Sequence, residues 1–450
     1  MRQPAASYDR YEQDHATFER RLSPNEPAWL RGLRRRGLEA FSSLGFPTGT
    51  RGNERWKYTN VGPLARTTFG YASAANGSGA NESIIRDIAP WHEDWTRLVF
   101  IDGSFSPALS SRQTGGKGMH VANLPDAVSR NGVAPEEHLG QYADVGEDGF
   151  TALNTAFMQD GAFVNVPDET SPGAPLHLLF VSTGRDAPTV SHPRSLIVVG
   201  RNSRLTVLES YVGLPGASYF TNAVAEIVGK EGSEIEHHRY MMESPSAFHI
   251  GATRVTLERD SSYVSTGMAK GARIARNDLS VLLDAPGSSC DLKGLYFTSG
   301  SQHIDNHIDI DHAKPNSSSN QFFKGILADR SRAVFSGRVL VRKDAQKSFA
   351  RQSDKNLLLS QGARINTKPS LEIFADDVQC FHGATAGAVA EEALFYMKSR
   401  GLDEDTARRL LIAGFAGEII DSIQLGPLRE HMERMFSRDA SEIGVLAAAS

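Results

Sequence analysis

A cysteine and a histidine two positions apart, Cys380 and His382, carry the clearest chemical potential in this chain. They lie where a segment rich in strand-forming residues gives way to sequence typical of helices. In an extended backbone, residues i and i+2 point to the same face, so the thiol and the imidazole would project side by side. Thiolate and imidazole both suit zinc, copper and iron–sulfur species. The pair predicts a soft-metal or sulfur site, whereas the alternative for a lone cysteine is a small buried core residue.

The segment HIDNHIDIDH, residues 303–312, forms a second polar group. On a strand, its imidazoles and carboxylates share one face, and three isoleucines line the other. The members of the polar face are His303, Asp305, His307, Asp309 and Asp311. Such a row can share a divalent metal, or it can form a hydrated or interface ladder beside an apolar core, and the ladder is the commoner arrangement.

The elements that must position these residues are mostly strands between about residues 161 and 383. Short apolar runs alternate there with turns of related character, which begin at Asn202, Gly232, Asp260 and Gly287. The separations are 30, 28 and 27 residues, and Ser331 to Gly362 adds another of 31. A repeat of that length without helices between the strands indicates a solenoid, whose turns each add short strands to a parallel β-helix. A two-sheet sandwich or jelly roll is the alternative.

Helical patterns flank this body, so we expect three parts. Residues 1–95 form a mostly helical region with a flexible loop at 70–83, residues 96–385 a β-rich body, and residues 386–450 a helical domain. In the last part, apolar residues recur every four positions, which is typical of a helix with one buried stripe. These residues are Leu411, Phe415, Ile419 and Ile423. The stripe either packs on the β-rich body or receives a partner.

Composition excludes several classes of protein. The chain has 450 residues, 40% of them hydrophobic, and no apolar run near the roughly 20 residues that span a bilayer, so we expect no membrane insertion. A net charge of −5 argues against nucleic acid as a partner. The polar first residues resemble neither a secretory signal nor a transit peptide. The chain has two cysteines, Cys290 and Cys380, which are too few for a disulfide framework. The simplest location for such a protein is a reducing cytoplasm. We expect Cys290 to be a packed core residue.

Signatures of several enzymes are absent. The chain has no G-x-x-x-x-G-K-[ST] loop, so we expect no nucleotide to bind by that mechanism. It has no G-x-S-x-G or H-E-x-x-H motif either. Two cysteines cannot supply the four thiolates of a stable cluster. If this protein handles iron and sulfur, it must therefore share ligands with another chain.

Several separate segments resemble the SufB/SufD family of scaffold proteins of the Suf iron–sulfur cluster assembly system. They occur in the family's order and span most of the chain. They are ERWKYTNV (54–61), HIDNHIDIDH (303–312), SSSNQFFKGIL (317–327), DKNLLLS (354–360), LEIFADDVQCFHGATAG (371–387), EEALFYMKSRGL (391–402) and ARRLLIAGFAGEIID (407–421). The run QCFHGAT favours the SufD branch, because the SufB pattern carries a glutamate-containing run there.

This resemblance implies a mainly β fold with a right-handed parallel β-helix core, an N-terminal helical region and a C-terminal helical domain. It also implies a non-catalytic scaffold subunit that pairs with SufB through the β-helix and docks SufC, the ATPase subunit, on its C-terminal helices. A transient iron–sulfur cluster would be shared with SufB, with His382 as the first ligand from this chain and Cys380 as a second ligand or sulfur acceptor. Residues expected to dock SufC are Leu394, Phe395, Leu411, Phe415 and Ile419. Reduced flavin accompanies assembly in the family, but these residues contain no flavin motif.

Two alternative functions stay open at this point. The chain can be a purely structural partner that stabilises SufB and recruits SufC without touching the cluster. It can be a β-helix enzyme that acts on polysaccharide, although such an enzyme would normally carry a secretion signal. Without SufB, the chain can also form a homodimer. The polar face of residues 303–312 can belong to the SufB contact.

Overall fold

The computed structural model describes residues 8–20, 22, 26–48, 53–71, 81–111, 118–129, 135–184 and 187–447. Residues 72–80 of the predicted loop lie outside these ranges. The N-terminal helices are α1 (Tyr8–Glu19), α2 (Ala28–Leu44), η2 (Glu54–Trp56), α3 (Gly62–Arg66), α4 (Glu82–Ile88), α5 (Leu124–Ser129), η4 (Pro135–Glu137) and α6 (Gly149–Phe157). The C-terminal helices are α7 (Glu391–Ser399), α8 (Glu404–Ile420) and α9 (Gly426–Ala447).

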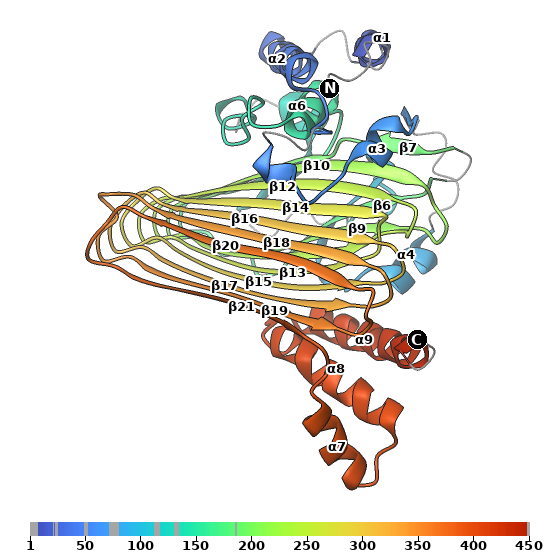
Figure 1. The fold of residues 1–450 in the computed structure, drawn as a ribbon. Coiled ribbons are helices and arrows are strands. Elements are labelled where there is room, and N and C mark those ends of the chain that lie inside the picture. Colours follow the sequence, from blue (N-terminus) through green and yellow to red (C-terminus); the bar gives the residue numbers. More distant parts are fainter. Residues whose placement is uncertain are drawn as a thin grey trace.

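Two facing sheets form the central body (Figure 1). The 11-stranded sheet, sheet A, consists of β1 (Gly70–Tyr71), β4 (His120–Asn123), β5 (Ala162–Val166), β7 (Thr189–Ser191), β8 (Arg194–Val199), β10 (Tyr219–Gly229), β12 (Phe248–Leu257), β14 (Ile274–Leu283), β16 (His303–His312), β18 (Arg332–Val341) and β20 (Arg364–Ile373). The 10-stranded sheet, sheet B, consists of β2 (Thr96–Ile101), β3 (Ser104–Phe105), β6 (Leu176–Ser182), β9 (Arg204–Gly213), β11 (Glu234–Met242), β13 (Ser262–Lys270), β15 (Ser289–Thr298), β17 (Ser318–Leu327), β19 (Phe349–Leu358) and β21 (Gln379–Gly387).

The chain passes from one sheet to the other and back in each turn. From β8 onward, even-numbered strands join sheet A and odd-numbered strands join sheet B, and every pairing among them is parallel. This arrangement confirms the predicted parallel β-helix. It excludes the sandwich and the jelly roll, because both are built from antiparallel strands.

The predicted repeat comes from one corner of this β-helix. Two residues before each of β9, β11, β13 and β15, the backbone has a positive φ, a conformation that glycine, asparagine and aspartate tolerate best. The φ angles are 51° at Asn202, 67° at Gly232, 54° at Asp260 and 78° at Gly287. A buried serine follows each of them. The pair Ser331 and Gly362 belongs to the opposite corner, where it precedes β18 and β20.

In-register parallel pairing stacks the inward side chains of sheet B into columns. One column, column 1, contains Leu205, Ile235, Tyr263, Cys290, Ser319, Ala350 and Cys380. The adjacent column, column 2, contains Val207, His237, Ser265, Leu292, Gln321, Gln352 and His382. Cys290 is buried in column 1, as predicted for a packed residue. The interior is therefore apolar along much of column 1 and becomes polar toward the C-terminal end of column 2.

Helical segments pack on part of the outer face of each sheet (Figure 1). Trp56 and Leu64 of the N-terminal region pack with Phe248 and Ile274 on sheet A. On sheet B, buried residues of α8 and α9, Ile419 and Met432 among them, join one hydrophobic cluster with Tyr240, Leu295 and Ile326. Burying each such side chain contributes about 1.5–3 kcal/mol, so these contacts fix the helices to the β-helix. Among the described helices, none combines the length and the apolar character that crossing a membrane requires.

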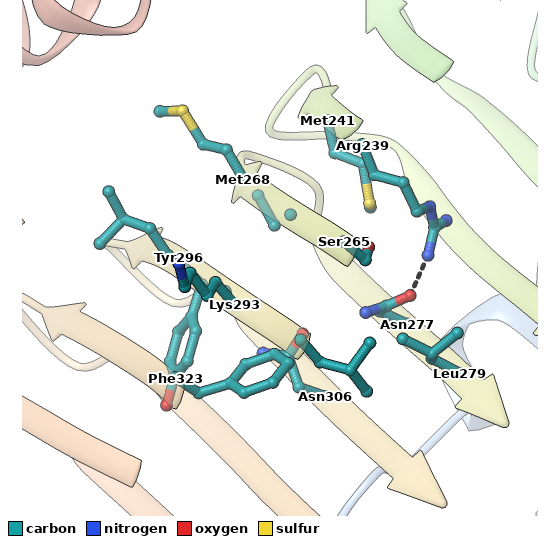
Figure 2. Close-up of a pocket in the computed structure, with 15 residues that line it drawn as sticks. Arg239, Met241, Ser265, Met268, Asn277, Leu279, Lys293, Tyr296, Asn306 and Phe323 are labelled. Atoms are coloured by element: carbon teal, nitrogen blue, oxygen red, sulfur yellow. Dashed lines mark hydrogen bonds between the residues drawn. The ribbon is translucent and has the colours of Figure 1, made fainter. Parts of the chain in front are cut away.

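An interior cavity of about 30 Å³ lies between the sheets (Figure 2). Arg239 and Asn277 at its wall are hydrogen-bonded to each other. Two wall atoms, Arg239 Nε and Asn306 Nδ2, are buried without a hydrogen-bond partner among the described residues. The volume suffices for one or two waters, which would satisfy these donors.

Two glycines at this cavity should respond oppositely to an added methyl group. At Gly267 the nearest atom to a new Cβ is the Lys293 carbonyl oxygen at 3.9 Å, whereas at Gly294 two ring carbons of Phe323 lie at 2.3 Å. We expect Gly267→Ala to raise the free energy of unfolding by about 0.4–1 kcal/mol, because alanine restricts the unfolded chain. Gly294→Ala should lower it by about 1–3 kcal/mol, because the core is overpacked. Urea unfolding of both variants tests this, and equal shifts would contradict it.

Candidate functional site

The last turn of the β-helix brings Cys380 and His382 together. Both lie on β21, where they pair with the buried residues Ala350 and Gln352 of β19. Partners in a parallel sheet point to the same side, so both side chains are on the interior face. They share one face, as the i, i+2 spacing predicted. Cys380 packs against the main core cluster. His382 is exposed, because none of the described turns covers the interior face of β21.

β20 and β21 are the terminal strands of sheets A and B, so one end of the β-helix is an open edge (Figure 1). On β20, the amides of Arg364 and Phe374 donate toward β18, which directs the amide positions of odd-numbered residues to the open edge. Pro369 occupies one of these outward positions and has no N–H to offer. An edge proline blocks strand addition at that point, so β20 is a protected edge.

The edge of β21 carries no such block. Gln379 donates to the Ser348 carbonyl oxygen of β19 at 3.1 Å, so the odd-numbered amides of β21 face inward to the sheet. The amides of the even-numbered residues, Cys380, His382 and Ala384 among them, face the open edge instead. An unprotected edge of this kind is a template for pairing with another strand. The residues with soft-ligand side chains thus lie on the strand that is free to pair.

Exposed hydrophobic side chains gather at one corner of this open end, where β20 ends and β19 and β21 begin. Phe381 on β21 is 56% exposed, and Phe374, just after β20, is 65% exposed. Phe349 and Ile373 are also exposed, and the ring of Phe349 lies 6.2 Å from that of Phe381. Contiguous exposed apolar groups of this kind mark protein–protein interaction sites.

Beneath the open end, the interior is polar. Gln352 Nε2 donates to Gln321 Oε1 at 3.0 Å, and Asn356 Nδ2 donates to Asp354 Oδ2 at 2.7 Å. Burial raises the pKa of Asp354 to about 6. Burial also raises the pKa of the Cys380 thiol. The thiol is therefore protonated in the free chain, and a metal or a cation must be near before a thiolate forms.

The row at 303–312 is an ion-pair ladder on the outer face of sheet A. Arg338 pairs with Asp309 at 3.1 Å, and Arg342 pairs with Asp311 at 2.7 Å. Burial lowers the pKa of His307 to about 4, so its imidazole is neutral at pH 7. No cluster of three or more His, Cys, Asp or Glu that could hold a metal ion occurs within the described ranges. The ladder alternative is thus the one that these contacts favour.

The predicted docking residues for SufC fall into two groups. Phe395 on α7 is 75% exposed, and Leu394 and Leu411 are half-buried. Phe415 packs partly and Ile419 fully against the outer face of sheet B, so these two are core residues of the α8 contact. Two further exposed residues that the sequence did not single out, Tyr396 and Leu410, lie on the same two helices.

Family models match almost the whole chain. Residues 5–178 match the SufBD protein N-terminal region, and residues 180–415 match the SufBD core domain of the SUF system for FeS cluster assembly. An iron–sulfur cluster assembly SufBD family protein of Synechocystis is 34% identical over 424 residues, 92% of each chain. The iron–sulfur cluster assembly protein SufD of Escherichia coli is 30% identical over 94% of each chain, and SufD of Bacillus subtilis is 25% identical over 92% of this chain and 94% of its own. With the open-ended β-helix described above, these matches show that this chain belongs to the SufBD family of iron–sulfur cluster assembly proteins.

Proposed function

We propose that this chain is a SufD-type subunit of a scaffold on which nascent iron–sulfur clusters are assembled. A SufB-type subunit joins the open end, and a SufC-type ATPase docks on the C-terminal helices. The observation that carries this proposal is the position of Cys380 and His382 on the interior face of β21, a terminal strand whose outer edge pairs with no described strand. A partner that adds a strand there necessarily comes beside both side chains.

The chemistry of the open end supports a shared, transient cluster. This chain offers one thiol and one imidazole there, so the remaining ligands must come from the partner. The raised pKa of Cys380 suits a site that binds metal only when the partner is in place, because the thiol then resists oxidation at rest. The imidazole of His382 binds metal as its neutral form.

The C-terminal helices support an ATPase contact. Phe395, Tyr396 and Leu410 expose large apolar side chains on α7 and α8, and exposed apolar groups of this kind mark protein–protein interaction sites. Only residues 388–390 separate β21 from α7. A movement of α7 caused by nucleotide binding in the ATPase would therefore act directly on the strand that carries Cys380 and His382.

Proline at position 384 tests the edge-pairing step. Ala384→Pro removes an amide that faces the open edge and keeps the ladder to β19, so the free chain should fold normally. We expect association with a SufB-type subunit to weaken about 10- to 100-fold, because a partner carbonyl loses its donor at a buried interface. Iron loading of the complex should fall with the association. Gel filtration and titration of the two purified subunits measure the affinity of their association.

Ala384→Ser is the matched control, since it keeps the amide and should associate like the wild type. Ala386→Pro, at the next even-numbered position of β21, should repeat the loss. Wild-type affinity in both proline variants, with circular dichroism showing intact folding, would rule out pairing through β21.

A further inference from the structure

Gln352 lies directly below His382 in column 2, one turn inside the open end. Paired positions in a sheet are about 4.8 Å apart, so the amide and the imidazole are neighbours. Gln352 is 2% exposed, and its Nε2 donates to Gln321 Oε1. Its Oε1 is buried and has no hydrogen-bond partner among the described residues. A buried carbonyl oxygen without a donor costs free energy, so this acceptor calls for an explanation.

The opposite sheet holds the amide in place. Gly337 of β18 faces the interior, and a Cβ there would lie 2.0 Å from Gln352 Nε2. The side chain of Gln352 thus crosses the interior and fills the space that a glycine leaves. An apolar residue would satisfy packing in this column, as Leu292 and Val207 do in deeper turns. Packing alone does not require an amide here.

We propose that Gln352 is a positioning residue for His382. This proposal rests on the function proposed above. When a partner covers the open end, one ring N–H of His382 donates to Gln352 Oε1. The other ring nitrogen is then unprotonated and directed toward the open end, where it can bind metal. Metal-binding histidines generally need such an acceptor, which fixes both the tautomer and the orientation of the ring. Gln321 holds the amide of Gln352 from the other side.

Cobalt(II) binding to the apo complex tests this role. Gln352→Met keeps the shape of the side chain but removes the acceptor, and we expect it to weaken Co²⁺ binding about 10- to 100-fold. Gln352→Glu keeps an acceptor, and the Gln321 amide, whose Nε2 is unpaired, can turn over and donate to it, so this variant should retain wild-type affinity. Arg351→Met, on the exposed outer face of the same strand, is the matched control. Ligand-field absorption of the bound cobalt gives the affinity.

The tautomer of His382 provides a readout that a purely structural role would not change. In the apo complex with ¹⁵N-labelled histidine, the ring-nitrogen shifts of His382 are identified by their loss in His382→Asn. We expect one tautomer in the wild type and in Gln352→Glu, and a mixture in Gln352→Met. Equal behaviour of the Met and Glu variants in both measurements would overturn the proposal.

The same experiment separates the two levels of the argument. If His382→Ala leaves Co²⁺ affinity unchanged, the histidine is no ligand, and both the ligand role and the role of Gln352 fail. If His382→Ala weakens binding but Gln352→Met does not, only the positioning role is overturned.

Discussion

In the proposed complex with SufB-type and SufC-type partners, replacing His382 by alanine should leave the assembly intact but largely without a cluster. Its side chain lies on the interior face of β21, and the backbone of that strand, which pairs with β19, is unchanged by the substitution. Loss of a group that merely orients a metal ligand costs about 10- to 100-fold in affinity, so loss of the ligand itself should cost at least about tenfold. Anaerobic reconstitution of the co-expressed complex, followed by iron content and visible absorption, measures this.

Cys380→Ala should reduce iron loading by a smaller factor. Its thiol is protonated in the free chain, so it contributes only after a metal or a cation has drawn off the proton. Gln379→Ala, on the exposed outer face of the same strand, is the matched control and should load iron normally. Gel filtration establishes that each complex is intact. Wild-type iron content in both the His382 and the Cys380 variants would reduce this chain to a structural partner.

The β-helix was predictable because its corners repeat in the sequence. Residues that tolerate a positive φ recur at Asn202, Gly232, Asp260 and Gly287, each followed by a serine that the structure buries. The i, i+2 spacing likewise sufficed to place Cys380 and His382 on one face. What the spacing could not show was that this face is the interior one at an open end. That depends on which strand is last, and a repeat alone does not reveal where stacking stops.

Other parts of the site depend on pairs of residues far apart in the sequence. Gln352 comes beneath His382 only through a register of 30 residues, and Gly337 meets Gln352 only across the two sheets. A repeat of known register would have identified the pair of Gln352 and His382. No local pattern in the sequence marks the contact between Gly337 and Gln352. In the same way, a four-residue period predicted the stripe of α8 but not which members face the β-helix, and Ile419 proved to be buried.

Asp278 connects the N-terminal region to the β-helix, and its loss should be the most damaging single change outside the site. Its carboxylate, on the outer face of sheet A, accepts from Arg55 at 2.6 Å, from Arg254 at 3.0 Å and from Arg276 at 3.1 Å. Although burial opposes ionisation, the three guanidinium groups hold the pKa of Asp278 well below its usual range. Arg55 belongs to the segment ERWKYTNV, far from β14 in the sequence. This carboxylate therefore links the segment 54–61 to β14 through side-chain contacts.

Asp278→Ala should lower the free energy of unfolding by about 3–5 kcal/mol, because it leaves buried guanidinium groups without their shared partner. A carboxylate with a depressed pKa contributes stability above its unfolded pKa of about 3.9, and that contribution is lost as the pH falls through the folded value. The gap between the wild type and Asp278→Ala should thus stay constant from about pH 8 to pH 5 and narrow below about pH 4. Urea unfolding across this range measures it, with Asp284→Ala, at an exposed carboxylate just after β14, as the control. If this difference in unfolding free energy does not depend on pH, then the packing of the Asp278 side chain, and not its charge, holds the N-terminal region against sheet A.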